Sequence, residues 1–309
     1  MENENIRKLL YVIPASFEGK YLKDFLVSQG FSQELIKHLK KTLGLDMFHI
    51  LKYGEEVKID IVEDETSDIE PNPNLKYEII YEDEDMLIVN KPSDMPIHPS
   101  QGNHKNTLGN AIVAHFNNQN FVYRPITRLD RDTSGVCLIA KNKFSASIFS
   151  EHMSKNFIKR SYIGLVKGNV YNALHINPNL ESISNLNDIA DLELVINSPI
   201  KRVDDSTIER CVAPDGEYAL TKVFAMKYYE KLDISLCKFI LLTGRTHQIR
   251  VHMKHIGYPI IGDFLYNPDY SLIDRQALHS NELLMNHPIT HELLRFDAKI
   301  PDDINVLIR

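Results

Sequence analysis

The sequence is short of the patterns that mark membrane, secreted and metal-binding proteins. No apolar run in its 309 residues approaches the roughly 18 residues that a bilayer-spanning helix needs. The first residues, Met1 to Asn5, are acidic and polar, so we expect no secretory signal. The cysteines, Cys137, Cys211 and Cys237, lie far apart without metal-site spacing and are expected to be reduced thiols. We therefore expect a cytoplasmic protein with no membrane association and no bound metal.

An excess of positive charge is also missing. The chain has 35 lysines and arginines against 42 aspartates and glutamates, a formal net charge of −7 at pH 7. Taken alone, this disfavours nucleic-acid binding, because phosphate contacts need lysine and arginine. The charges are unevenly spread, however: acids gather between Glu55 and Asp85, and bases gather between Arg124 and Arg160 and again between Arg245 and Lys254. This pattern allows a local basic cleft, and it equally allows scattered solvated side chains.

Apolar periodicity outlines a small N-terminal unit. Residues 1–62 are predicted to follow the order strand, helix, helix, strand. Apolar helical faces occur at Tyr21–Leu26 and Leu35–Leu39, and Gly54–Ile61 alternates as a strand does after a turn. Residues 63–74 are acidic and contain two prolines, so they are predicted to be a linker.

Strand signals dominate residues 75–309, which form the second predicted domain. Strands are expected near 161–167, 219–230 and 234–242. Helices are expected from a Thr107 cap through His115, over 143–155, and from a Thr246 cap to Ile256 with a stop at Gly257. Residues 171–190 are predicted to be a surface loop. The predicted fold class is α+β with a largely antiparallel mixed sheet.

The most informative stretch runs from Arg128 to Gly135 and leads into the apolar run Val136–Ala140. Its Thr-Ser-Gly end is expected to form a tight turn between a charged loop and a strand. Asp130 then lies in a loop at a sheet edge with arginine on both sides, and this positive field favours its charged form. Asp130 is therefore a candidate nucleophile, the alternative being a solvated turn of paired charges. A glycosidase pair with Asp132 is disfavoured, because residues so close in a loop would not flank one bond.

The segment Thr127–Gly135 resembles motif II of the RluA family of pseudouridine synthases, usually written H-R-L-D-x-x-T-S-G, with Thr127 where histidine is usual. Other segments resemble the family's motifs in the same order: Tyr81–Pro92 with Met95–Pro99, the K-x-Y element at Lys159–Tyr162, motif III at Thr243–Met253, and the C-terminal elements Gly262–Asp263, Arg275–His279 and His287–Pro288. The resemblance covers roughly residues 75 to 309. Several ordered motifs are far more specific than any one of them.

The resemblance implies an RNA pseudouridine synthase that isomerises uridines in ribosomal or transfer RNA. An isomerisation needs no redox cofactor, so none is expected. The resemblance assigns Asp130 as nucleophile, Arg250 as the cation that keeps it charged and placed, and Tyr162 as the aromatic that holds a flipped base. The expected substrate contacts are Arg128, which fills the vacated space or grips the backbone, Leu278, which lines the uracil pocket, and the basic residues Lys159, Arg160 and Arg245.

Other interpretations of these residues remain open. Tyr162 could be an ordinary strand aromatic, and Arg250 could be a surface helix residue paired with Asp263. A metal site at His252 and His255 is disfavoured, because the motif supplies no third carboxylate or cysteine ligand. The alternative function is a non-catalytic RNA-binding or ribosome-associated protein on the same fold, but such a protein would have no chemical need for the nucleophile, its cation and the aromatic together. A monomer is the default expectation.

The N-terminal unit resembles the small alpha-L RNA-binding domain that precedes the catalytic domain in many relatives. Its basic helix surface is thin, with Lys37, Lys40 and Lys41 as its best candidates. Both RNA binding and a packing role are therefore open for residues 1–62.

Overall fold

The computed structural model describes residues 5–63, 65–117, 120–173, 181–183 and 192–309. Its elements in chain order are β1 (Asn5–Val12), η1 (Ala15–Phe17), α1 (Leu22–Ser28), α2 (Gln33–Leu43), β2 (Glu56–Glu63), β3 (Glu78–Glu82), β4 (Met86–Lys91), α3 (Leu108–His115), β5 (Arg124–Pro125), β6 (Ser134–Ala140), α4 (Lys143–Ser154), β7 (Lys159–Lys167), η2 (Val170–Asn172), β8 (Glu181–Ile183), β9 (Leu192–Asn197), β10 (Ile200–Arg202), β11 (Arg210–Val212), β12 (Leu220–Tyr229), η3 (Glu230–Leu232), β13 (Ile234–Leu241), α6 (Gln248–His255), β14 (Leu278–Asn286), β15 (Leu293–Asp297) and α7 (Asp302–Asn305). No helix within these ranges is long and apolar enough to cross a bilayer.

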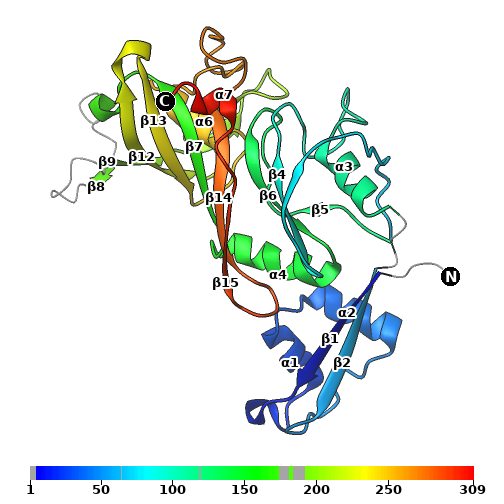
Figure 1. Ribbon diagram of the computed structural model, residues 1–309. Coiled ribbons are helices and arrows are strands. Elements are labelled where there is room, and N and C mark those ends of the chain that lie inside the picture. Colours follow the sequence, from blue (N-terminus) through cyan, green and yellow to red (C-terminus); the bar gives the residue numbers. More distant parts are fainter. Residues whose placement is uncertain (1–4, 64, 118–119, 174–180, 184–191) are drawn as a thin grey trace.

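The N-terminal unit is a two-stranded antiparallel sheet packed against two helices, α1 and α2 (Figure 1). Alternate residues of β2 are buried, and they meet the apolar faces of both helices. The predicted order strand, helix, helix, strand is confirmed. Tyr21 is the exception to the predicted faces, because it lies at the N-cap of α1 and is 42% exposed.

The N-terminal unit shares its core with the rest of the chain. Phe144 and Ile148 of α4 belong to the same buried cluster as α1 and α2, and the rings of Phe31 and Phe144 lie 4.3 Å apart. At one end Arg7 of β1 donates two hydrogen bonds to Asp85, at 3.0 and 2.9 Å. The unit is therefore held against α4 and the large sheet by both apolar contact and charge.

The segment predicted as a linker is bound to the large domain at several of its described residues. Residues 65–74 form neither a helix nor a strand, which is expected of a linker. However, Ser67 donates its backbone N–H to the Phe121 carbonyl, and Asn72 donates to the carbonyl of Asn110. Ile69 also packs against the main core. The segment is therefore a docked connection rather than a free spacer.

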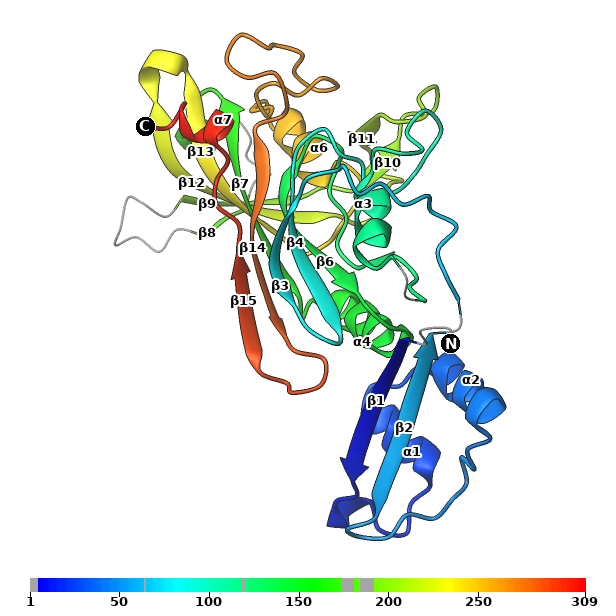
Figure 2. The same ribbon diagram turned by 45° about the vertical axis from the view of Figure 1, so that its right-hand side comes forward.

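The larger part of the chain is built on one sheet with the strand order β3-β4-β6-β14-β7-β13-β12-β9-β8, with β15 paired to β14 and β5 to β6 (Figures 1 and 2). All its pairings are antiparallel except the short parallel contact between β6 and β14. The predicted α+β class with a largely antiparallel mixed sheet is confirmed.

The first half of this sheet is covered on both faces, which explains its unbroken apolar strands. In β4, Leu87 and Val89 pack in the cluster that contains α3, whereas Met86 and Ile88 pack in the cluster that contains Phe149 of α4. A strand buried on both faces has no polar face and therefore loses the alternation of a half-buried strand. The predicted helices α3 and α4 are confirmed, each with its expected N-terminal boundary.

Three local predictions are corrected by the structure. The tight turn lies at Asp130–Thr133, where the Thr133 N–H donates to the Asp130 carbonyl, and Ser134 already belongs to β6. Helix α6 begins at Gln248 with His247 at its N-cap, one residue after the predicted Thr246 cap. In the predicted loop 171–190, η2 reaches Asn172 and Glu181–Ile183 form β8, while 174–180 and 184–190 lie outside the described residues.

Gly135 permits the parallel contact that brings β14 beside the charged loop. Its φ is +115°, and a Cβ at this position would lie 2.1 Å from the backbone oxygen of Ser280 in β14. Backbone atoms cannot give way as a side chain can, so this position requires glycine for both conformation and space.

We predict that Gly135→Ala lowers the free energy of unfolding by roughly 3–5 kcal/mol, about 1–2 from the strained backbone and the rest from overpacking. Gly257→Ala is the matched control, because Gly257 has φ +88° but open space around its missing Cβ. It should cost only the conformational part, about 1–2 kcal/mol. Urea unfolding of the two variants measures the difference, and equal losses would contradict the close approach of β6 and β14.

Candidate active site

The guanidinium of Arg250 joins two carboxylates from distant parts of the chain. Its Nε and Nη2 donate to Asp263 at 2.6 and 2.7 Å, and its Nη1 donates at 2.8 Å to Asp130, which lies 120 residues away in sequence. The side chains of Arg250 and Asp263 are 1% and 0% exposed, whereas that of Asp130 is 26% exposed. Arg250 is therefore an interior residue, and the interpretation as a surface helix residue is wrong, although its pairing with Asp263 is real.

The surroundings of Arg250 hold the guanidinium in one orientation. Asp263 also accepts the backbone N–H groups of Leu265 and Tyr266, which fixes the carboxylate. The rings of Phe264 and Tyr266 lie 5.4 and 5.1 Å from the guanidinium carbon. Burial alone would lower the pKa of Arg250, but hydrogen bonding and charge from Asp263 and Asp130 outweigh it and raise the pKa. The group is a permanent, oriented cation.

Asp130 presents its carboxylate from a fixed turn. Within the described part of the chain, only its Oδ2 has a hydrogen-bond partner, which is Arg250. Thr133 closes the turn through its N–H and accepts a 2.7 Å hydrogen bond from Gln276. Just before the turn, Thr127 accepts the N–H of Leu138 at 2.9 Å, so the threonine at the position where histidine is usual supports the start of the motif.

Lys91 supports the same turn from beneath. Its side chain is fully buried, and its ammonium donates at 2.8 Å to the carbonyls of Pro92, Met95 and Arg131. Burial lowers the pKa of Lys91 to about 8. This role was not predicted, because Lys91 is the last residue of β4 and follows Asn90, where a lysine gives no distinctive sequence signal.

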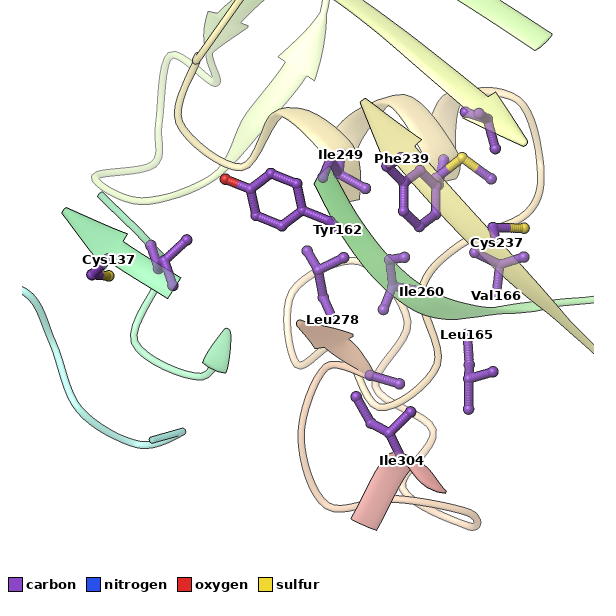
Figure 3. Close-up of a cluster of buried hydrophobic side chains, with 14 of the residues drawn as sticks. Cys137, Tyr162, Leu165, Val166, Cys237, Phe239, Ile249, Ile260, Leu278 and Ile304 are labelled. Carbon is purple, nitrogen blue, oxygen red and sulfur yellow. The ribbon is translucent and has the colours of Figure 1, made fainter. Parts of the chain in front are cut away.

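A small pocket of about 50 Å³ opens beside Asp130. Tyr162, Ile249 and Leu278 give it an apolar floor that continues into the main core (Figure 3). Burial raises the pKa of Tyr162. The sequence-predicted residues that the structure brings together around this pocket are Asp130, Tyr162, Arg250, Arg128, Leu278 and Arg245.

Two arginines at the pocket differ in their pairing. Arg128 is exposed, and it has no hydrogen-bond or ion-pair partner within the described ranges. Arg245 is also exposed, but it pairs with Glu217 at 2.6 Å and donates to the Tyr218 carbonyl at 2.9 Å. Arg128 is thus the more available cation.

Gln248 and His252 fix the position of α6. Gln248 accepts hydrogen bonds from the Thr243 hydroxyl and the Arg245 N–H, and it donates to Thr221 and to the Leu220 carbonyl, both in β12. His252 uses both ring nitrogens, with Thr221 and with the carbonyl of Ser198. Burial lowers the pKa of His252 to about 4, so it is neutral at pH 7. The sequence did not reveal these positioning roles of Gln248 and His252.

Known proteins share this chain's motifs and its fold. The family model for RNA pseudouridylate synthase matches residues 85–255, which include Asp130, Tyr162 and Arg250. The uncharacterized RNA pseudouridine synthase YjbO of Bacillus subtilis is 33% identical over 93% of this chain and 98% of its own length. Ribosomal large subunit pseudouridine synthase D of Buchnera aphidicola is 33% identical over 94% of this chain and 89% of its own. The chain belongs to the RNA pseudouridylate synthase family.

The solved structure of human RNA pseudouridylate synthase domain containing 1 shares the fold of this synthase, with a TM-score of 0.56 and 23% identity over 75% of this chain and 86% of that chain. Several relatives named ribosomal large subunit pseudouridine synthase D place the chain with the RluA-type enzymes. It is an RNA pseudouridine synthase, an isomerase.

The bases between Arg124 and Arg160 do not form one cleft at the pocket. Several of them pair with acids elsewhere: Arg124 and Lys143 with Glu63, Lys141 with Glu82, and Lys155 with Glu151. Lys159 is exposed at the start of β7, and Arg160 is buried beneath the loop at Thr243 and Gly244. The structure does not place Lys159 or Arg160 among the residues that line the pocket.

One group of side chains in the described residues has ligand atoms close enough for a metal ion, namely Asp83, Asp85 and His287. Their atoms already bond to one another or to the protein. Asp85 accepts two hydrogen bonds from Arg7, and Asp83 pairs with His287 at 2.9 Å. The group lies at the junction of the N-terminal unit and the sheet, and none of its members lines the pocket.

We predict that Asp263→Asn lowers the free energy of unfolding by about 3–5 kcal/mol, because a buried arginine loses the charge of its bidentate partner. Asp130→Asn is the matched comparison, since it removes the charge of the other, partly exposed partner and leaves Asp263 in place. It should cost within about 1 kcal/mol. Chemical denaturation of both variants gives the two values, and a larger loss for Asp130→Asn would show that the turn, not Asp263, holds Arg250.

Proposed function

We propose that this synthase isomerises uridines in structured RNA with Asp130 as the nucleophile and the target base flipped against Tyr162. One observation carries the proposal: a buried arginine, itself held by Asp263, fixes Asp130 at a pocket with an apolar floor. A carboxylate placed in this way can attack or stabilise the anomeric carbon of a uridine whose base enters the pocket.

The proposed reaction breaks the bond between uracil N1 and the ribose anomeric carbon, turns the base, and joins the same carbon to uracil C5. The hydrogen on C5 leaves as a proton and N1 gains one, so the product is an isomer of the substrate. Arg250 stays charged throughout and holds Asp130 in place. Because burial raises the pKa of Tyr162, its phenol keeps its proton at neutral pH, which suits packing against the base.

The RNA contacts are proposed from exposure and pairing. Arg128 is exposed at the rim and has no partner among the described residues, so it is available to fill the space that the flipped base leaves or to bind the backbone. Leu278 packs against the uracil on the pocket floor, and Arg245 contacts RNA at the rim. Lys159 and Arg160 complete the proposed contacts, although both lie outside the pocket lining.

We infer that the substrate is ribosomal or transfer RNA. The relatives named for the ribosomal large subunit favour ribosomal RNA as the first to test. We also propose that the enzyme acts in the cytoplasm as a monomer, without a cofactor or metal. Residues 1–62 would be an alpha-L-like unit whose exposed Lys37, Lys40 and Lys41 on α2 contact RNA. Residues 63–74 would connect it to a catalytic domain at 75–309.

The alternative is a binding-only protein on the same fold. The buried charges argue against it. Burying Arg250 and Asp263 costs solvation free energy, and a buried pair makes no contact with RNA at the surface. A pocket floor made of Tyr162, Ile249 and Leu278 is likewise hidden from a partner that does not flip a base.

We predict that Asp130→Asn abolishes pseudouridine formation while RNA affinity stays within about twofold of wild type, because the change removes the nucleophile but only one partly exposed charge. Release of tritium from RNA labelled at uracil C5 measures the reaction, and filter binding measures affinity. Asp94→Asn is the control, since Asp94 is an exposed aspartate near the turn with a positive φ that asparagine tolerates. Near-normal turnover by Asp130→Asn would refute the assignment.

We predict that Arg250→Ala loses at least about 100-fold in single-turnover rate and that Arg250→Lys recovers part of it. Lysine restores the charge but cannot bridge Asp263 and Asp130 with one planar group, so the carboxylate would be held less well. Rates and RNA dissociation constants are compared at one salt concentration, with circular dichroism to confirm folding. If folded variants lost only affinity, Arg250 would be a substrate contact and not the partner of the nucleophile.

A further inference from the structure

Arg160 is a buried cation without a counter-charge. Its residue is only 8% exposed, yet no carboxylate lies within ion-pair distance of it among the described residues. Among the described residues its side chain makes one hydrogen bond, a long one of 3.4 Å from Nη2 to the Thr243 carbonyl, and its Nε is buried without a partner. Arg250, the other buried arginine of the site, makes three charge-assisted hydrogen bonds.

Such an arrangement is unfavourable in the protein alone. A charge removed from water needs a partner to offset its lost solvation, and an unmade hydrogen bond adds to the cost. An anion that arrives with the substrate would supply the missing counter-charge at Nη1, which lies beneath Gly244. Arg160 lies two residues before Tyr162 in β7, so it is next to the proposed uracil pocket.

The loop above Arg160 is open to such an anion. Gly244 is exposed, and a Cβ there would lie 2.8 Å from Nη1 of Arg160, so any side chain would crowd the guanidinium. Within the described residues, the backbone N–H groups of Gly244 and Thr246 donate to no protein acceptor. The loop leads directly into the N-terminus of the eight-residue helix α6, which carries a partial positive charge.

We propose that Arg160 and the loop from Thr243 to Thr246 bind a backbone phosphate of the substrate RNA. The proposal rests on the proposed function, since RNA supplies the anion. Arg245 and His247 follow Gly244 and line the pocket, so the phosphate belongs to a nucleotide close to the target uridine. Holding it there would fix the position of the flipped nucleotide. Arg160 is thus a substrate-positioning residue and does not touch the reacting atoms.

The first test is Arg160→Met, which keeps the length of the side chain and removes its charge. The dissociation constant for an in vitro transcript of large-subunit ribosomal RNA should rise about tenfold. The slope of log affinity against log salt should become shallower by roughly one, as for the loss of one phosphate contact. Stability toward urea should stay equal or increase, because an unpaired buried charge is gone. The control is Arg295→Met, at an exposed arginine paired with Glu282 and Asp297. It should change neither the dissociation constant nor the salt slope.

The second test is Gly244→Ala, which leaves Arg160 in place but crowds the approach to it. It should weaken RNA binding by a similar factor, and the double variant should lose little more than either single one, because both act on the same phosphate. If Arg160→Met does not fold, Gly244→Ala decides alone: an unchanged salt slope overturns the phosphate site.

The outcomes separate this site from the proposed function. Arg160→Met with lower stability and unchanged RNA affinity would show that the arginine only braces the Thr243 loop, and the proposal would be wrong. Tritium release from the same transcript, measured with wild-type protein, reports catalysis independently. A wild-type protein that forms no pseudouridine in this transcript but shows an Arg160-dependent salt slope would count against large-subunit ribosomal RNA as the substrate and leave the phosphate site standing.

Discussion

The site depends on one buried guanidinium that can bind two carboxylates at once. Arg250 donates two hydrogen bonds to Asp263 and one to Asp130. Asp263 therefore fixes the guanidinium, and the guanidinium in turn orients Asp130. Asp263 is fully buried and satisfied by backbone N–H groups, which makes it a rigid support. Asp130 is partly exposed and keeps one oxygen free of protein partners within the described structure. Arg250 therefore orients the Asp130 carboxylate, and one carboxylate oxygen stays open beside the pocket.

The pairing of the basic residues matters more than their number. On a protein with net charge −7, most arginines and lysines of the first basic stretch are neutralised by nearby acids, such as Glu63 and Glu82. Arg128 and Arg160 are the arginines of that stretch without an ion pair in the described ranges; one is exposed at the pocket and the other is buried beside it. An acidic protein can therefore bind RNA through a few unpaired cations while its other surfaces repel RNA. This distribution of charge favours placement of RNA at the pocket over non-specific binding.

The sequence predicted the parts of the site that depend on local pattern. The order of the motifs gave Asp130, Tyr162 and Arg250, and periodicity gave the strands around them. It offered the pairing of Arg250 with Asp263 only as a surface alternative, because the burial of this pair arises only when α6 and the following loop fold together. Lys91 and Gln248 were also missed. Lys91 binds backbone carbonyls, which no side-chain pattern reveals, and Gln248 binds β12, which is distant in sequence. The turn was predicted too late in the sequence because Gly135 was interpreted as a turn residue. In the structure this glycine instead permits the close contact between β6 and β14.

The N-terminal unit is attached rigidly, and this constrains how it could take part. The tilted rings of Phe31 and Phe144 pack 4.3 Å apart inside a shared core, and Arg7 binds Asp85 just before β4. The connecting segment is itself hydrogen-bonded to α3 and the residues beyond it. A unit on a flexible tether would have to be ordered when RNA binds, whereas this one is already placed, which lowers the entropic cost of a joint contact. Any RNA contact by α2 would therefore lie at a set position relative to the pocket.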